Sequence, residues 1–179
     1  GREYAEIMDV SRLGGICGKG LTLHGSAGNG GERIYETPSG MLNSIGLENP
    51  GVKKFVETEA AFMRSLGPAV ICNLGGHCES DYLEGAQMLN DADIDILELN
   101  ISGPNVKAGG MAFGLLPETA ADITRKVRAV TRHPLMVKLS PNAPDIAAVA
   151  RACEDAGADA ISLVNTFLGM AVDVTRRKA

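Results

Sequence analysis

Short apolar runs that end near a polar residue alternate along the chain with longer segments of helical periodicity. The apolar runs are rich in β-branched residues and predict five strands, at Gly15–Lys19, Ala69–Asn73, Ile94–Asn100, Leu135–Ser140 and Ala160–Asn165. The periodic segments predict helices at Val52–Leu66, Glu79–Leu89, Pro117–Val130 and Pro144–Ala156. Continuous apolar strands joined by helices are typical of a buried parallel sheet, so the pattern indicates an α/β fold.

Local signals mark the ends of the predicted helices. Pro117 and Pro144 are expected in first turns, each followed by an acidic residue, and Gly157 is expected to stop the last helix. The stretch from Leu21 to Pro50 is rich in Gly, Asn and Ser and predicts a long irregular connection, which in a compact domain is usually functional. No linker or low-complexity tract divides residues 1–179, so a single domain is expected.

Composition narrows the function classes. The chain has 179 residues, 45% hydrophobic, with a net charge of -5, which argues against a nucleic-acid surface. No apolar run approaches the roughly 20 residues of a membrane span. The four scattered cysteines are expected to be free thiols of a cytoplasmic protein. Cys72, His77 and Cys78 lack a second ligand pair at zinc spacing, so no metal site is expected.

Polar residues at the ends of the predicted strands are the first candidates for chemistry. They comprise two lysines and three asparagines: Lys19, Asn73, Asn100, Lys138 and Asn165. In parallel α/β folds the ligand lies at the carboxyl ends of the strands. Asparagines also end strands simply as turn formers, but Lys138 stands between apolar neighbours and needs an anion or an electron-rich ring to meet its charge.

Five segments together carry a resemblance to a known family. They read GKGLT (18–22), TPSGMLNSIGLENPG (37–51), LELNISGPNVKAGG (97–110), MVKLSPN (136–142) and SLVNT (162–166). In this order they closely resemble class 1 dihydroorotate dehydrogenase, and NSIGLENPG resembles the 1B subclass, whose catalytic subunit pairs with an iron–sulfur flavoprotein. The resemblance implies a TIM barrel that uses FMN to oxidise dihydroorotate to orotate in pyrimidine biosynthesis.

The resemblance also implies roles for individual residues. The substrate would be bound by Lys19, Asn43, Ser44, Ile45, Gly46, Leu47, Asn100, Asn105, Asn165 and Thr166. FMN would be bound by Lys19, Gly20, Asn73, Asn100, Lys138 and Val164. Amide side chains suit a flat ring of amide groups because they both donate and accept, and a lysine suits its carboxylate. Lys138 would stabilise the negative charge that develops on the reduced flavin, and Gly46 would allow the backbone to approach the substrate closely.

One position departs from the family pattern. The family places a Cys or Ser base after Asn-x-Ser, whereas this chain reads Asn100-Ile101-Ser102-Gly103. Gly103 has no side chain to accept a proton, and Ser102 is expected to face away because neighbouring residues of an extended segment alternate in direction. A positioned base is typically worth 10²–10⁴-fold, so we expect binding to survive and turnover to fall by about that factor.

The resemblance further implies a partner subunit carrying FAD and an iron–sulfur cluster, and a homo-oligomer or heterotetramer. A TIM barrel typically needs about 250 residues, so this chain is expected to be a partial (β/α)8 barrel of about five βα units. The first strand is expected before Gly1 and the last two after Ala179. Open apolar edges would then make the segment alone aggregate or bind FMN poorly. Two alternatives stay open: a non-catalytic remnant or interaction fragment, and a related flavoprotein acting on a uracil-like ring.

Overall fold

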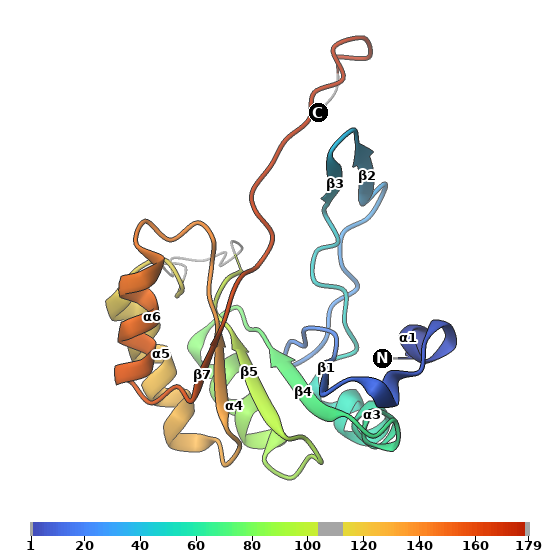
Figure 1. The fold of residues 1–179 in the computed structure, drawn as a ribbon. Coiled ribbons are helices and arrows are strands. Elements are labelled where there is room, and N and C mark those ends of the chain that lie inside the picture. The colour runs from blue at the N-terminus through green and yellow to red at the C-terminus, as the bar shows by residue number, and fades with distance from the viewer. Residues whose placement is uncertain (1, 104–112, 178–179) are drawn as a thin grey trace.

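The structure is a computed structural model that describes residues 2–103 and 113–177 (Figure 1). A five-stranded parallel sheet forms its centre, in the order β1-β4-β5-β6-β7. Its strands are β1 (Gly15–Cys17), β4 (Ala69–Leu74), β5 (Ile96–Asn100), β6 (Leu135–Lys138) and β7 (Ala160–Ser162). The sheet curls with helices along one side, so the predicted α/β class and partial TIM barrel are confirmed.

Helices occupy the connections between these strands. A continuous helical run precedes β4 and consists of α2 (Val52–Lys54), the π-helical segment η2 (Phe55–Glu59) and α3 (Ala60–Ser65). The remaining crossovers are α4 (Glu79–Leu89), α5 (Pro117–Val130) and α6 (Ile146–Asp155). Two short helices that were not predicted precede β1, namely α1 (Arg2–Ile7) and the 3-10 helix η1 (Val10–Arg12). No helix among the described residues is long and apolar enough to cross a membrane.

The ends of several elements differ from the predictions. Pro117 opens α5 as expected, but Pro144 lies outside α6, because Asp145 is the N-cap and accepts a hydrogen bond from the Ala148 amide at 2.8 Å. Gly157, with φ of 104°, does follow the last helix. β1, β6 and β7 end two or three residues before their predicted polar ends. Individual backbone hydrogen bonds join neighbouring segments beyond the ends of the paired strands, for example from Gly18 N to Ile71 O at 3.0 Å.

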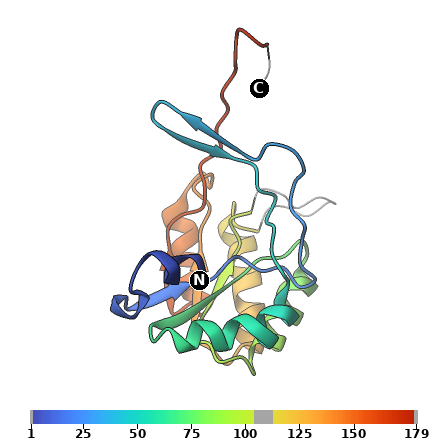
Figure 2. The same ribbon diagram turned by 90° about the vertical axis from the view of Figure 1, so that its right-hand side faces the viewer.

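A β-hairpin interrupts the stretch from Leu21 to Pro50, which was predicted to be irregular. β2 (Ile34–Thr37) pairs antiparallel with β3 (Gly40–Asn43) across a two-residue turn. Neither strand has a buried residue, so the hairpin lacks the alternation that would reveal it in the sequence. The hairpin and the residues after β7 project from the same end of the sheet (Figures 1 and 2).

The two faces of the sheet differ in chemistry, and this difference positions the site. On the helix-covered face the side chains are apolar and almost all buried: Ile16, Val70, Cys72, Leu74, Leu97, Leu99, Leu135, Val137 and Ile161. On the other face the amino-terminal half is also apolar: Ile71 pairs with Ile96, and Met136 lies in register with Glu98. The carboxyl-terminal half of that face is polar. The open face is therefore apolar like a barrel core in its amino-terminal half and polar at the carboxyl ends of the strands.

Candidate functional site

The polar half of the open sheet face gathers side chains from four strands. The residues are Asn73 on β4, Glu98 and Asn100 on β5, Lys138 on β6 and Ser162 on β7. The parallel register pairs Asn73 with Glu98, Asn100 with Lys138, and Lys138 with Ser162. Paired residues of adjacent parallel strands point to the same face. The predicted set Asn73, Asn100 and Lys138 is therefore assembled on one surface by the strand register alone.

Hydrogen bonds join the amides of this surface into a directed chain. The Ser102 hydroxyl donates to Asn100 Oδ1 at 2.6 Å, and Asn100 Nδ2 donates to Asn73 Oδ1 at 3.1 Å. Asn73 Nδ2 donates in turn to Glu98 Oε2 at 2.5 Å. The second carboxylate oxygen of Glu98 accepts from the Ser162 hydroxyl at 2.6 Å. Asn73 and Glu98 are only 4% and 7% exposed, so the chain ends on a buried carboxylate.

The segment after β1 lies directly against this chain of amides. Leu21 N donates to the backbone oxygen of Asn73 at 2.8 Å, which holds the strand ends of β1 and β4 together. A Cβ atom on Gly20 would lie 2.7 Å from Asn73 Oδ1 and 3.4 Å from Leu47 Cδ1. A larger residue at position 20 would therefore collide with the Asn73 amide. Gly20, Leu47, Asn73 and Asn100 therefore lie close together.

Asn49 fixes the loop that carries the predicted substrate residues. Its Oδ1 accepts from Thr22 N at 3.0 Å and from Gly51 N at 2.9 Å, and its Nδ2 donates to Leu47 O at 2.7 Å. Leu47 itself has a left-handed backbone with φ of 55°, which an apolar L-residue rarely adopts. The hydrogen bonds of Asn49 form a clamp on Leu47. Asn49 is 8% exposed, so this clamp is shielded from water. The loop is thus held in one conformation that costs local strain.

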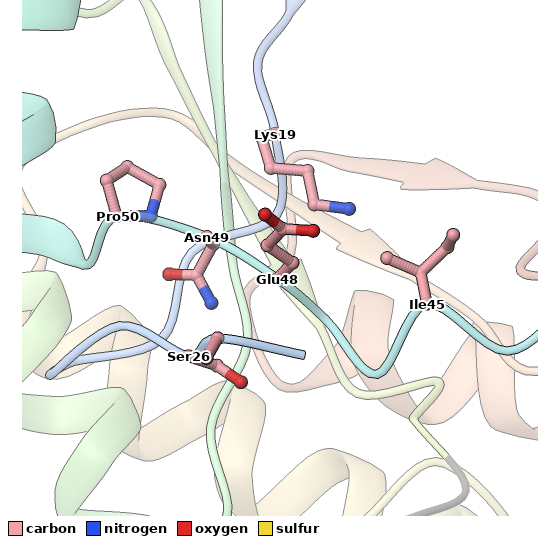
Figure 3. A pocket seen from close by; sticks show the side chains of 7 residues that line it. Lys19, Ser26, Ile45, Glu48, Asn49 and Pro50 are labelled. Atoms are coloured by element: carbon pink, nitrogen blue, oxygen red, sulfur yellow. The ribbon is translucent and has the colours of Figure 1, made fainter. Parts of the chain in front are cut away.

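A cavity of about 510 Å³ lies between this loop and Lys19 (Figure 3). Its lining residues are Lys19, Ser26, Ala27, Ile45, Glu48, Asn49 and Pro50. Glu48 binds Arg33, with 2.7 Å between Oε2 and Nη1. Within the described residues, no carboxylate forms an ion pair with Lys19 or Lys138. Two ammonium groups at this rim are therefore available to an anion or an electron-rich ring.

Two titratable side chains, the buried Tyr82 and the exposed Cys17, adjoin the amide surface. The Tyr82 hydroxyl donates to the backbone oxygen of Asn100 at 3.0 Å, and burial raises the pKa of Tyr82 to about 12. The Cys17 thiol lies 3.5 Å from Glu98 Oε2. Desolvation, followed by the negative charge of Glu98, raises the pKa of Cys17 to about 12. Both groups are therefore neutral at physiological pH, and Cys17 is a poor nucleophile there.

Other predicted residues lie elsewhere or at the margin of this surface. Asn43 and Ser44 line a second cavity, between the hairpin and residues 169–176. Asn165 Nδ2 donates to Ser102 O at 3.4 Å, which brings Asn165 to the amide chain, whereas Thr166 is exposed. Val164 is half-buried next to Asn165. Asn105 lies outside the described residues, and the proposed ligand contacts of all these residues stay predictions.

Gly46 is tightly packed against the protein itself. It has φ of 74°, and a Cβ atom there would lie 2.6 Å from Asn29 atoms. Asn29 in turn donates from Nδ2 to Ser44 O at 2.9 Å. The close backbone approach at Gly46 is therefore to Asn29, a requirement that is independent of any substrate contact.

Gly103 lies at the exposed end of the amide chain. A Cβ atom at Gly103 would have nothing within 4 Å among the described residues. Ser102 is 3% exposed, and its hydroxyl is already committed to Asn100. The hydroxyl reaches the Asn100 amide of this surface, and the expectation that Ser102 faces away from the reaction space stays a prediction. The position that the resemblance assigns to the base is thus open among the described residues, and the adjacent hydroxyl is occupied.

Several residues of the site were missed in the sequence. Glu98 and Ser162 stand inside runs that were interpreted as apolar strands ending in asparagine, and Asn49 stands in a loop without periodicity. The signal for Glu98 was available, since a charged residue within a buried strand needs a partner. Asn49 gave no comparable signal.

Comparisons with known proteins find matches along the whole chain. The family model described as dihydroorotate dehydrogenase matches residues 1–179. A Petrotoga mobilis protein named dihydroorotate dehydrogenase B (NAD(+)), catalytic subunit, is 49% identical over 179 residues, covering 100% of this chain and 60% of its own length. Proteins of the same name from Alkaliphilus metalliredigens and Bacteroides thetaiotaomicron are 49% and 48% identical, each over 99% of this chain and 59% of their own lengths. The chain therefore spans about 60% of the length of these relatives and belongs to the dihydroorotate dehydrogenase family.

Proposed function

We propose that this chain forms the dihydroorotate- and FMN-binding part of a flavin-dependent dihydroorotate dehydrogenase of the 1B type. One observation carries the proposal. Two lysines without an ion pair among the described residues flank a directed chain of asparagine amides at the carboxyl ends of parallel strands. Such a surface offers cations together with neutral donors and acceptors, which a flat ring with amide groups and one negative charge requires.

The residues present fit an FMN ring system. Gly20 leaves room beside the Asn73 amide that a Cβ atom would fill. The half-buried Lys138 lies in register with Asn100 and has no carboxylate partner among the described residues. When bound, FMN supplies the acceptor for a hydride. Gly20, Asn73, Asn100, Lys138 and Val164 would hold it, and Lys138 would favour negative charge on the ring.

The substrate would lie on the loop side of the same surface. Lys19 would meet the carboxylate of dihydroorotate, while Asn43, Asn100, Asn105, Asn165 and Thr166 would bind the polar edge of the ring. The loop residues Ser44, Ile45, Gly46 and Leu47 would enclose it. Asn49 supports this role because it fixes Leu47 through the 2.7 Å bond to its carbonyl. A loop that is already fixed before the substrate binds loses less conformational entropy on binding.

Turnover is expected to be slow in this chain. Gly103 offers no proton acceptor, and the neighbouring Ser102 hydroxyl donates to Asn100. Binding depends on other residues and is expected to persist. This separation favours a site that binds dihydroorotate and orotate but removes the ring proton inefficiently.

The names of the relatives support a partner subunit. Their names describe catalytic subunits of an NAD(+)-linked enzyme. We infer that this chain works in the cytoplasm with an electron-transfer subunit that carries FAD and an iron–sulfur cluster, within a homo-oligomer or heterotetramer.

The proposed function is tested by binding, which does not require turnover. Because the segment alone is expected to bind FMN poorly, it is purified within a complete barrel of the length of its relatives. That protein is reconstituted with FMN, and the flavin spectrum is recorded during titration with orotate and, separately, with uracil, which lacks the carboxylate. We expect a yellow protein whose spectrum responds to orotate at much lower concentration than to uracil. Protein that retains no flavin would support a non-catalytic fragment instead. An equal response to both rings would favour a flavoprotein acting on uracil-like substrates.

A further inference from the structure

Glu98 is a buried carboxylate on the open face of the sheet that the proposed function does not use. It is 7% exposed and lies between Asn73 on β4 and Ser162 on β7. Burying a carboxylate is unfavourable unless hydrogen bonds compensate for lost hydration. Both of its oxygens accept such bonds, at 2.5 Å from Asn73 Nδ2 and 2.6 Å from the Ser162 hydroxyl. The question is what this arrangement does for the site above it.

An ionised carboxylate accepts hydrogen bonds and cannot donate them. Asn73 must therefore turn its Nδ2 toward Glu98, which leaves Oδ1 facing the other way. That oxygen accepts from Asn100 Nδ2 at 3.1 Å, so the orientation of Asn100 is determined in the same manner. Asn100 Oδ1 is then left to accept from the Ser102 hydroxyl at 2.6 Å. The carboxylate of Glu98 thus sets the orientation of the Asn73 amide, and the Asn73 amide sets that of Asn100.

We propose that Glu98 is a positioning residue that sets the donor and acceptor directions of Asn73 and Asn100 for ligand recognition. An asparagine amide has nearly the same shape after a half-turn, so packing alone does not select its orientation. A site that distinguishes ring oxygens from ring N–H groups needs this selection. Reversal would put a donor where an acceptor is required and leave buried polar groups unpaired. The orientation itself is a property of the ligand-free protein, and only its use in recognition rests on the proposed function.

Two substitutions separate the acceptor role of Glu98 from its charge. Glu98→Met has similar bulk and no acceptor, so the Asn73 amide loses the partner that orients it. Glu98→Gln can still offer Oε1 to Asn73 while its Nε2 donates to the Ser162 hydroxyl, which keeps the orientation without the charge. Ser162→Ala is the matched control, because it removes the bond from the Ser162 hydroxyl to Glu98 and leaves the amide chain untouched.

The first readout is hydrogen exchange of the Asn73 and Asn100 side-chain amides by NMR in protein without ligand. We expect slow exchange in the wild type, Glu98→Gln and Ser162→Ala, and exchange at least tenfold faster in Glu98→Met. The second readout is the orotate dissociation constant of FMN-loaded protein, expected to rise about tenfold or more in Glu98→Met and less than about threefold in Glu98→Gln.

The outcomes distinguish this proposal from the proposed function. Unchanged amide exchange in Glu98→Met would overturn the role of Glu98, whatever the ligand is. Slow exchange that is lost in Glu98→Met, in a protein that does not respond to orotate, would support the orienting role and overturn the proposed substrate. Should Glu98→Met fail to fold, Glu98→Gln still decides. Fast amide exchange in that variant would show that the charge, not the acceptor geometry, maintains the site.

Discussion

Replacing Gly103 with cysteine should restore the chemical step that this chain is expected to lack. The structure favours the substitution, since no described residue lies within 4 Å of a Cβ at Gly103 and the backbone there is not left-handed. The change in folding free energy should therefore be less than about 1 kcal/mol. The new thiol would extend from a position directly after Ser102, whose backbone oxygen accepts from Asn165. It would stand at the edge of the amide surface.

The size of the gain follows from what a base contributes. A positioned general base is worth about 10²–10⁴-fold, or about 3–5 kcal/mol of activation free energy at about 1.4 kcal/mol per tenfold. The substitution should act on the rate of flavin reduction by dihydroorotate. Orotate binding should change by less than about threefold, because neither lysine nor the amide chain is altered.

The assay is anaerobic stopped-flow mixing of FMN-loaded protein with dihydroorotate, followed by loss of flavin absorbance. Gly103→Ala is the matched control, because it fills the same space without an acid–base group. We expect Gly103→Cys to reduce flavin at least a hundredfold faster than either the wild type or Gly103→Ala. Equal rates in the cysteine and alanine variants would refute the assignment of position 103 as the empty base position.

Three further substitutions test the surroundings of the site. Asn49→Ala leaves buried loop donors unpaired and should lower the free energy of unfolding by about 1–3 kcal/mol, measured by urea denaturation; an unchanged midpoint would contradict the clamp on Leu47. Gly20→Ala places a Cβ 2.7 Å from Asn73 Oδ1 and should weaken FMN binding at least tenfold by fluorescence titration, whereas unaltered affinity would place the flavin elsewhere. Burial raises the pKa of Tyr82 to about 12, against about 10 in an unfolded chain. The unfolded state then loses this proton first, so stability should fall as pH rises from about 10 to about 12, and Tyr82→Phe should flatten that fall in urea midpoints. An equally steep fall in the variant would assign it to other groups.

The sequence predicts the parallel sheet well because its strands are apolar on the helix-covered face and its helices have clear periodicity. The Glu79–Leu89 and Pro117–Val130 helices have the predicted bounds. The hairpin of Ile34–Thr37 and Gly40–Asn43 was missed because it buries no residue and so leaves no periodic pattern. The start of α6 depends on a single side-chain hydrogen bond, which is why Asp145, and not Pro144, determines where this helix begins.

The site is predictable only in part. Strand register follows from the fold, so Asn73, Asn100 and Lys138 could be placed together from their positions at strand ends. Glu98 could not be identified as their support, because its role depends on which side-chain atoms of β4 and β7 reach it. The same holds for Asn49, whose partners are separated from it by turns that the sequence does not specify.

The central claim is that this surface binds a carboxylate-bearing pyrimidine beside FMN, with Lys19 meeting the carboxylate. The most direct measurement compares the orotate and uracil dissociation constants of FMN-loaded wild type and Lys19→Met from flavin difference spectra. We expect the wild type to prefer orotate by at least tenfold, since a cation paired with a carboxylate contributes about 1.5–3 kcal/mol. Lys19→Met should lose most of that preference while uracil binding stays within about threefold. A preference for orotate that is unchanged in Lys19→Met, or absent in the wild type, would contradict the account.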